Sequence, residues 1–237
     1  MKTTLHKADT RGSADHGWLK ANHTFSFASY QDPERMGFGV LRVINDDVIH
    51  PSMGFATHPH NDMEIISVPI SGALKHKDTM GNEFVIRKGE IQTMSAGTGI
   101  QHSEYNNSPQ ENTNLLQIWV HPRATGLEPR YSQKEYSASD RDNKFQLIVS
   151  PDGRDNSNPI YQDAFFSLAN LSAASELNYE KYKVDNGLYL FVISGDVDVN
   201  GTELNARDGL GIEDFDSLKI TASKDAELLL MEVPMNN

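Results

Sequence analysis

The chain has 237 residues, of which 38% are hydrophobic and 23% charged, enough for one large or two small globular domains. It contains no cysteine, so disulfides, thiolate metal sites and cysteine nucleophiles are excluded. A formal charge of −12 without clustered Lys and Arg argues against direct nucleic-acid binding. No apolar run is long enough to span a membrane and no signal peptide is apparent, so we expect a cytoplasmic protein without a membrane partner.

Short apolar runs separated by Gly, Pro, Asn and Asp predict an all-β chain with little helix. Turn pairs such as Asn200-Gly201 follow these runs, which favours an antiparallel sandwich or barrel over parallel βαβ units. Pro69 cannot donate a hydrogen bond to a β-ladder and therefore predicts a bulge or an edge position. In chain order the predicted strands span 40–44, 65–70, 115–120, 145–149, 165–171, 188–193 and 228–233.

Two short patches offer metal ligands, His58-Pro59-His60 and His102-Ser103-Glu104. Side chains two residues apart on a strand point to the same face, so each patch presents both ligands in one direction. We expect two such strands to face each other across a barrel and to close four ligands on one ion. Imidazole suits iron, copper, nickel and zinc, and the lack of thiolate argues against a closed structural zinc site. The patches therefore predict a catalytic metal site with open positions.

A short repeat indicates two copies of one barrel. Ile70-Ser71-Gly72 is echoed by Ile193-Ser194-Gly195, and later glycines follow in both halves. We predict one barrel in residues 1–130 and a second in 131–237. All nine histidines precede residue 122, so the first barrel is the one equipped for metal binding. Carrying the register across the repeat places Lys181, Lys183, Ala222 and Lys224 opposite His58, His60, His102 and Glu104.

These patches resemble the pirins, metal-binding bicupins of the cupin superfamily, and most closely the bacterial pirin-like quercetinase group. The resemblance implies two tandem cupin barrels, each a double-stranded β-helix or jelly roll, with the metal in the first. It implies His58, His60, His102 and Glu104 as ligands. Ordinary cupins take the carboxylate from the first motif, so Glu64 competes for the fourth place, and we favour Glu104. The motifs that carry the resemblance are His16-Gly17-Trp18, 23–28, 41–47, 58–65 and 94–104.

Glu64 has a second interpretation that needs no bond to the metal. It lies four residues beyond His60 and would face inward on a regular strand, where it could hydrogen-bond a ligand histidine. The alternative is a salt-bridge partner. We expect His50, His76 and His121 to be solvated or capped. Five aromatic residues are expected to pack in the core: Trp18, Phe25, Phe27, Phe38 and Phe55. The alternative is that they line a pocket for a flat aromatic substrate.

The function implied by the resemblance is a metal-dependent dioxygenase that cleaves flavonols such as quercetin with O2 and releases carbon monoxide. We expect one divalent transition metal per chain, Fe(II), although the ligand set accepts Cu, Ni, Co, Mn or Zn. Glu104 is the candidate base as well as a ligand. The alternative function is an iron-dependent, redox-sensing regulator that binds a transcription factor or another protein partner. For the enzyme we expect a monomer that takes a small aromatic substrate and O2.

Overall fold

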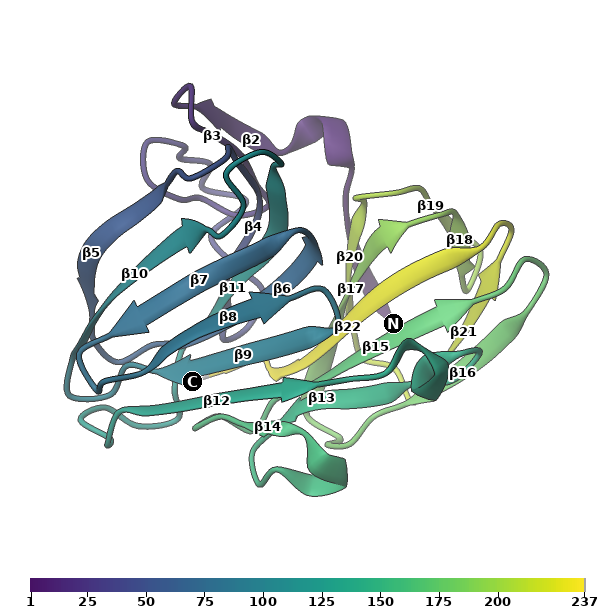
Figure 1. The fold of residues 1–237 in the computed structure, drawn as a ribbon. Helices are drawn as coiled ribbons and strands as arrows, with labels where there is room; N and C mark the ends of the chain where they lie inside the picture. The colour runs from purple at the N-terminus through teal and green to yellow at the C-terminus, as the bar shows by residue number, and fades with distance from the viewer. Residues whose placement is uncertain (237) are drawn as a thin grey trace.

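The computed structural model describes residues 1–236 and consists mainly of β-strands, which form two barrels side by side (Figure 1). This confirms the all-β prediction. Short apolar runs cut by Gly, Asn and Asp cannot continue as helices, and the chain returns through tight turns instead. The helical segments within these residues are short 3-10 turns: η1 (Ala8–Thr10), η2 (Ala138–Arg141) and η3 (Arg154–Asn156).

The first barrel combines a seven-stranded sheet with a four-stranded sheet. The four-stranded sheet carries both predicted ligand patches. In order, the large sheet contains β12 (Arg130–Glu135), β9 (Glu90–Ser95), β6 (Glu64–Ser71), β11 (Thr113–Val120), β4 (Leu41–Ile49), β3 (Leu19–His23) and β2 (Gly12–Asp15). The small sheet contains β5 (Gly54–His60), β10 (Ile100–Asn106), β7 (Ala73–Asp78) and β8 (Glu83–Arg87).

The second barrel repeats this plan with another seven-stranded and another four-stranded sheet. Its large sheet contains β1 (Lys2–His6), β20 (Gly209–Glu213), β17 (Asn186–Ser194), β22 (Ala226–Pro234), β15 (Phe165–Leu171), β13 (Gln146–Ser150) and β14 (Asn158–Pro159). Its small sheet contains β16 (Glu176–Glu180), β21 (Ser217–Ala222), β18 (Val197–Val199) and β19 (Thr202–Leu204).

The sequence repeat marks equivalent hairpins in the two barrels. Gly72 joins β6 to β7 with φ +74°, and Gly195 joins β17 to β18 with φ +82°. Both positions need a left-handed backbone, which glycine adopts without steric cost. Pro69 behaves as predicted, because the pairing of β11 with β6 shifts register between Asn114 and Leu115, and Leu115 is the partner of Pro69.

The ends of the chain cross between the barrels. Strand β1 pairs with β20 of the second barrel, and Figure 1 shows the N-terminus beside that barrel. At the other end, the Val40 amide donates to the Pro234 carbonyl oxygen at 3.0 Å, so the C-terminal segment contacts the first barrel. Strand β12, which begins at Arg130 and lies almost wholly beyond the predicted boundary, pairs with β9 of the first barrel. The division of the chain at residue 130 stays a prediction. Relative to it, β1 pairs with the second barrel and β12 with the first, so each of these strands belongs to the sheet of the other half of the chain.

One apolar core lies between the large sheets and draws on both barrels. It includes Phe38 and Ile118 from the first half and Tyr189, Phe191 and Met231 from the second. A separate apolar core fills the second barrel. The interior of the first barrel holds only small apolar clusters, because many of its inward positions are polar.

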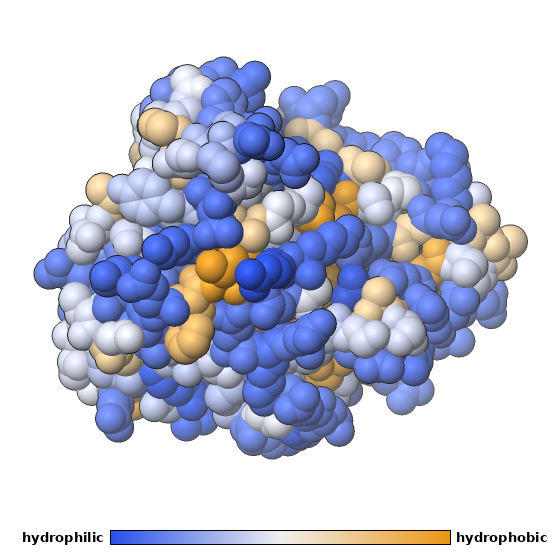
Figure 2. All heavy atoms as spheres, in the orientation of Figure 1, coloured by the Kyte–Doolittle hydropathy of each residue, from blue (hydrophilic) through white to orange (hydrophobic). Residues whose placement is uncertain are grey.

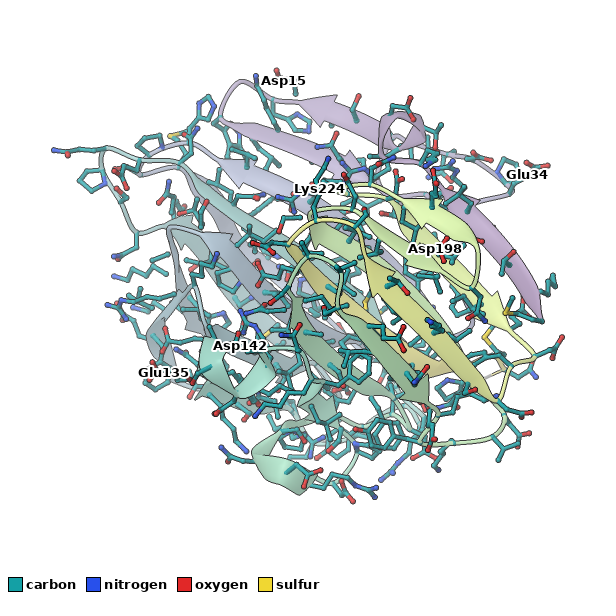
Figure 3. All side chains as sticks on the ribbon, turned by 90° about the vertical axis from the view of Figure 1, so that its right-hand side faces the viewer. Asp15, Glu34, Glu135, Asp142, Asp198 and Lys224 are labelled. Carbon is teal, nitrogen blue, oxygen red and sulfur yellow. The ribbon has the colours of Figure 1, made fainter. Side chains whose placement is uncertain are left out.

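The outer surface is mainly hydrophilic on the face drawn in Figure 2, with apolar side chains in small separate patches. In the view onto the second barrel, charged residues such as Asp198 and Lys224 lie on the outside (Figure 3). Within residues 1–236, no helix has the length and apolar character to cross a membrane.

Candidate metal centre

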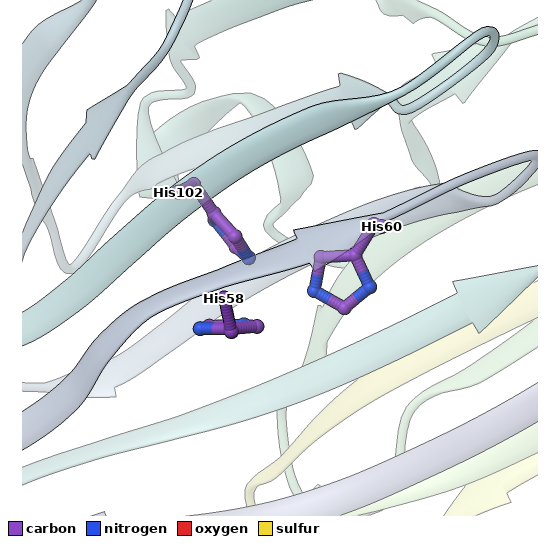
Figure 4. A group of neighbouring side chains, drawn as sticks. All are labelled: His58, His60 and His102. Atoms are coloured by element: carbon purple, nitrogen blue, oxygen red, sulfur yellow. The ribbon is translucent and has the colours of Figure 1, made fainter.

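Three imidazoles converge at one end of the small sheet of the first barrel. The ring centroids of His58 and His102 are 4.4 Å apart, and that of His60 is 4.9 Å from each (Figure 4). One nitrogen from each ring lies within 4.8 Å of the others, a group that could hold a metal ion. The two patches are neighbours in one sheet, with His102 paired to His58, so the expectation that they face each other across the barrel was wrong.

The histidine nitrogens are suited to coordination. Both ring nitrogens of His102 are buried without a hydrogen-bond partner, which is unusual for a polar group in a native interior. Burial and the neighbouring His102 and His58 lower the pKa of His60 to about 4. Burial and the neighbouring His58 and His76 lower the pKa of His102 to about 3. Both rings are therefore neutral near pH 7, the form that binds a metal.

Glu104 lies in the same region but belongs to a second group. A β-bulge separates it from His102, because the pairing of β10 with β5 shifts register between these two residues. Its carboxylate accepts a hydrogen bond from Gln117 Nε2 at 2.8 Å and faces the Ser67 hydroxyl at 3.4 Å. Ligand atoms of Glu104, His102 and His76 all lie within 4.8 Å of one another. Glu104 is thus close to one of the three clustered histidines and is held in place by Gln117.

His76 is not solvated, because its side chain is 0% exposed, and of the two roles expected for it the capped one fits. Its Nε2 lies 3.1 Å from Asp78 Oδ2, and its Nδ1 lies 3.4 Å from Gln92 Nε2. It pairs across the sheet with Glu104. A signal was present in the sequence: Lys75 and Lys77 alternate with His76 and its neighbours, which is the period of a half-buried strand.

Glu64 lies apart from the histidines. It accepts a hydrogen bond from the Ser95 hydroxyl at 2.6 Å. Burial raises its pKa, while Ser95, the Tyr161 backbone amide and Arg130 favour its charged form. The turn at Asp62, with φ +45°, interrupts the strand between His60 and Glu64. The parity argument that aimed Glu64 at a ligand histidine was therefore wrong. Among the described residues Glu64 forms no salt bridge, the other role considered for it, and its carboxylate is held by the Ser95 hydroxyl instead.

A row of polar residues crosses the large sheet on its inward face. Four directly paired positions place Gln92 opposite Ser67, Ser67 opposite Gln117, Gln117 opposite Asn45, and Asn45 opposite His23. His23 Nδ1 lies 2.8 Å from Asn45 Oδ1, and the Ser67 hydroxyl donates to Gln117 Oε1 at 2.9 Å. In the second barrel, Leu210, Leu190 and Leu230 are paired in the same way. The polar row explains why the first barrel is not filled by an apolar core.

A cavity of about 400 Å³ opens beside the histidines. Its size is within the range of small-molecule sites. Of the five aromatic residues expected to pack in the core, Phe27 and Phe55 line this cavity instead, and Trp18 packs against Phe55. Phe25 and Phe38 pack in the core between the barrels, as expected. The remaining lining residues are Ala14, His16, Leu19, Ala21, His23, Ala28, Ser29, Asn45, Asp47, His58, His60, Glu104, Gln117 and Trp119.

Asp47 is a cavity residue that the sequence analysis did not select. Its side chain is almost fully buried, and burial together with the charges of Asp46 and Glu104 raises its pKa to about 8. The neutral carboxylic acid therefore predominates at pH 7. A functional signal was hard to see in the sequence, because Asp46-Asp47 reads as an ordinary pair of surface carboxylates.

The second barrel lacks the ligand set. Leu218 pairs with Tyr179 as His102 pairs with His58, and Ile220 pairs with Leu177 and Val199 as Glu104 pairs with Phe55 and His76. The ungapped alignment of the repeat was therefore four residues out of register on this strand. Within residues 1–236, both groups of converging metal-ligating side chains lie in the first barrel.

The fold and the site together define a class: two fused cupin barrels, of which the first has a group of residues that could hold a metal ion. Comparison with known proteins agrees. Residues 4–120 match the family model described as pirin, and residues 147–233 match the model of the quercetinase C-terminal cupin domain. The chain belongs to the pirin family.

Relatives and solved structures agree over nearly the full length. The chain is 46% identical over 231 residues to quercetin 2,3-dioxygenase of Escherichia coli K12, covering 97% of this chain and 98% of the relative. It is 48% identical to a pirin-like protein of Caulobacter vibrioides, covering 94% and 96%. The crystal structure of the bacterial pirin YhhW of Escherichia coli with nickel(II) superposes with a TM-score of 0.93 at 43% identity, covering 98% and 99%.

Proposed function

We propose that this protein is a metal-dependent dioxygenase that cleaves flavonols such as quercetin with O2 and releases carbon monoxide. The observation that carries the proposal is a cluster of three imidazoles, of which His58 and His60 line a cavity with aromatic sides. The relative named quercetin 2,3-dioxygenase supports the substrate class. Such a cavity is the size of a small-molecule site, and this favours an enzyme over the alternative of a redox-sensing regulator.

His58, His60 and His102 are the proposed metal ligands, with Glu104 as the fourth. Both ring nitrogens of His102 are buried and have no hydrogen-bond partner, which suits a residue whose partner is a bound metal ion. When bound, a divalent metal lowers the pKa of a coordinated hydroxyl group and can support reaction with O2. Fe(II) is our proposal for the resident ion, and imidazoles with one carboxylate also suit nickel, copper, cobalt, manganese and zinc.

Glu104 is the proposed base for the substrate hydroxyl. Gln117 Nε2 holds one carboxylate oxygen at 2.8 Å, which leaves the other oxygen only the longer contact with Ser67 at 3.4 Å. The less firmly held oxygen is the one available to a substrate proton. Phe27, Phe55 and Trp119 would position the flat ring system and exclude water from it.

The test is aerobic turnover of quercetin by protein loaded separately with each candidate metal, followed by loss of flavonol absorbance and by carbon monoxide release. We expect metal-dependent turnover in the wild type, loss of both metal and turnover in His60→Ala, and retention of both in His121→Ala, which changes a histidine outside the cluster. If every metal-loaded form binds metal but leaves quercetin intact, the dioxygenase proposal fails and the regulator becomes the better explanation.

A further inference from the structure

The two neighbouring carboxylates of β4 have opposite surroundings. Asp46 points away from the cavity, where Arg11 Nη1 lies 3.1 Å from its Oδ2 and Asn114 Nδ2 donates to its Oδ1 at 2.9 Å. Asp47 faces the cavity and is 4% exposed, and its Oδ1 has no hydrogen-bond partner. Alternation along the strand separates the two roles. Asp46 is satisfied by the protein, whereas Asp47 keeps a buried oxygen free beside the cavity.

The neighbours of Asp47 explain why the protein leaves this oxygen unpaired. Its cross-strand partners are Ala21 on β3 and Leu115 on β11, which have no polar side-chain atoms. The other amides of the cavity wall are already engaged, Asn45 with His23 and Gln117 with Ser67 and Glu104. Buried polar groups without partners are rare in native proteins and are concentrated at functional sites. The missing partner of Asp47 is therefore expected on a ligand in the cavity.

We propose that Asp47 is a specificity-determining residue that hydrogen-bonds a ring hydroxyl of the substrate, away from the oxygens that face the histidines. This inference rests on the proposed flavonol chemistry and adds a second point of recognition to it. A flavonol presents its 3-hydroxyl and 4-carbonyl oxygens as one adjacent pair, so its other hydroxyls are free to meet the cavity wall. With the ring system held at two points, a substrate that lacks the second hydroxyl loses a hydrogen bond and leaves Asp47 unpaired.

The test compares quercetin with 3-hydroxyflavone, which keeps the 3-hydroxyl and the 4-carbonyl and lacks the other hydroxyls. Affinities are measured without O2 on full-length, metal-loaded protein by quenching of tryptophan fluorescence, since Trp119 lines the cavity. We expect the wild type to prefer quercetin by about tenfold, the effect of one hydrogen bond. In Asp47→Leu, which is similar in size and apolar, the preference should fall close to unity. The Asn side chain in Asp47→Asn can still donate and accept a hydrogen bond, so this variant should keep part of the preference for quercetin.

Asp140→Asn, an exposed Asp of η2, is the matched control and should keep the wild-type preference. Metal content and thermal melting of each variant show whether the barrel is intact. The inference is overturned if the intact Asp47→Leu variant keeps the preference, or if the wild type binds both compounds equally. Selective binding without carbon monoxide release would sink the dioxygenase proposal and leave the role of Asp47 standing. Binding of neither compound would overturn the flavonol class and this inference together.

Discussion

At the scale of single residues, the position of the Glu104 carboxylate depends on one amide, that of Gln117. Gln117 Nε2 holds its carboxylate at 2.8 Å, and Ser67 in turn orients Gln117. Partners that orient metal ligands commonly contribute 10- to 100-fold to metal affinity. We therefore expect Gln117→Leu to weaken metal binding by about tenfold or more, as measured by competition with a chelator.

The control for this prediction is Gln110→Leu, an exposed position in the loop before β11. It adds the same apolar side chain without touching Glu104, so its affinity should match that of the wild type. Unchanged affinity in Gln117→Leu would show that Glu104 does not contribute to the metal site.

His6 makes stability depend on pH. Its Nδ1 lies 2.8 Å from the Tyr189 hydroxyl, and burial, with a smaller effect of Arg35, lowers its pKa to about 4 from 6.5. The folded state therefore binds this proton less readily than the unfolded state. The resulting loss of stability is absent above pH 6.5, develops as the pH falls, and is complete below about pH 4.

Replacing His6 by Gln should flatten this dependence. We expect the difference in free energy of unfolding between pH 7.5 and pH 5, measured by urea denaturation of metal-free protein, to be about 2 kcal/mol smaller than in the wild type. An unchanged difference would mean that His6 is as accessible to protons in the folded state as in the unfolded chain.

Residues differ in how far the sequence could predict them. His58 and His60 could be selected because they lie two residues apart on a predicted strand, and His102 because it has the same spacing to Glu104. The role of Glu64 was misjudged because a turn at Asp62 resets the strand parity, and no spacing rule reveals such a turn. Asp47 differs from Asp46 only in the face to which it points, and this depends on which side of β4 becomes the cavity.

At the scale of secondary-structure elements, strand β1 is joined to the second barrel mainly by backbone pairing. Four of its five residues are exposed, and five registered pairs join it to β20. Deleting residues 1–6 removes this ladder and leaves β20 as an open sheet edge, which tends to pair with other chains.

We expect the deletion to lower the free energy of unfolding by about 1 kcal/mol for each lost hydrogen bond and to cause concentration-dependent association. Urea denaturation and size-exclusion chromatography with light scattering test both effects. Lys2→Ala keeps the backbone ladder and serves as the control. A deletion variant that matches the control in both measurements would show that β1 contributes nothing to the second barrel.

The elements were predictable where the apolar runs were long and buried. The runs at 115–120 and 228–233 became the central strands β11 and β22. Strand β1 has almost no apolar pattern, since only His6 is buried in it, so nothing in its sequence predicts a strand. Its partner lies some two hundred residues away, and pairing over that distance leaves no local signal.

At the scale of the whole molecule, the two barrels share one apolar core. Phe191 and Met231 of the second barrel pack in the same cluster as Phe38 and Ile118 of the first. The crossed ends add backbone pairing in both directions. We expect the protein to unfold as one cooperative unit, although its sheets form two barrels.

Both tryptophans, Trp18 and Trp119, lie in the first barrel, so their fluorescence reports on that barrel alone. Phe191→Ala should destabilise the protein by about 3–5 kcal/mol. It should shift the fluorescence midpoint in urea by the same amount as the far-UV circular dichroism midpoint. Two separated midpoints would contradict the shared core, and the exposed variant Tyr182→Ala provides the comparison.

The crossed N-terminus sets an order of events during synthesis. All strands of the first barrel, up to β12 at Glu135, leave the ribosome before β20 at Gly209–Glu213 has been made. At about 5–20 residues per second, β1 waits roughly 10–40 s for its partner strand. The three clustered histidines of the first barrel can come together within that interval, while the first six residues are still unpaired. When β20 of the second barrel has been made, β1 at the N-terminus can pair with it.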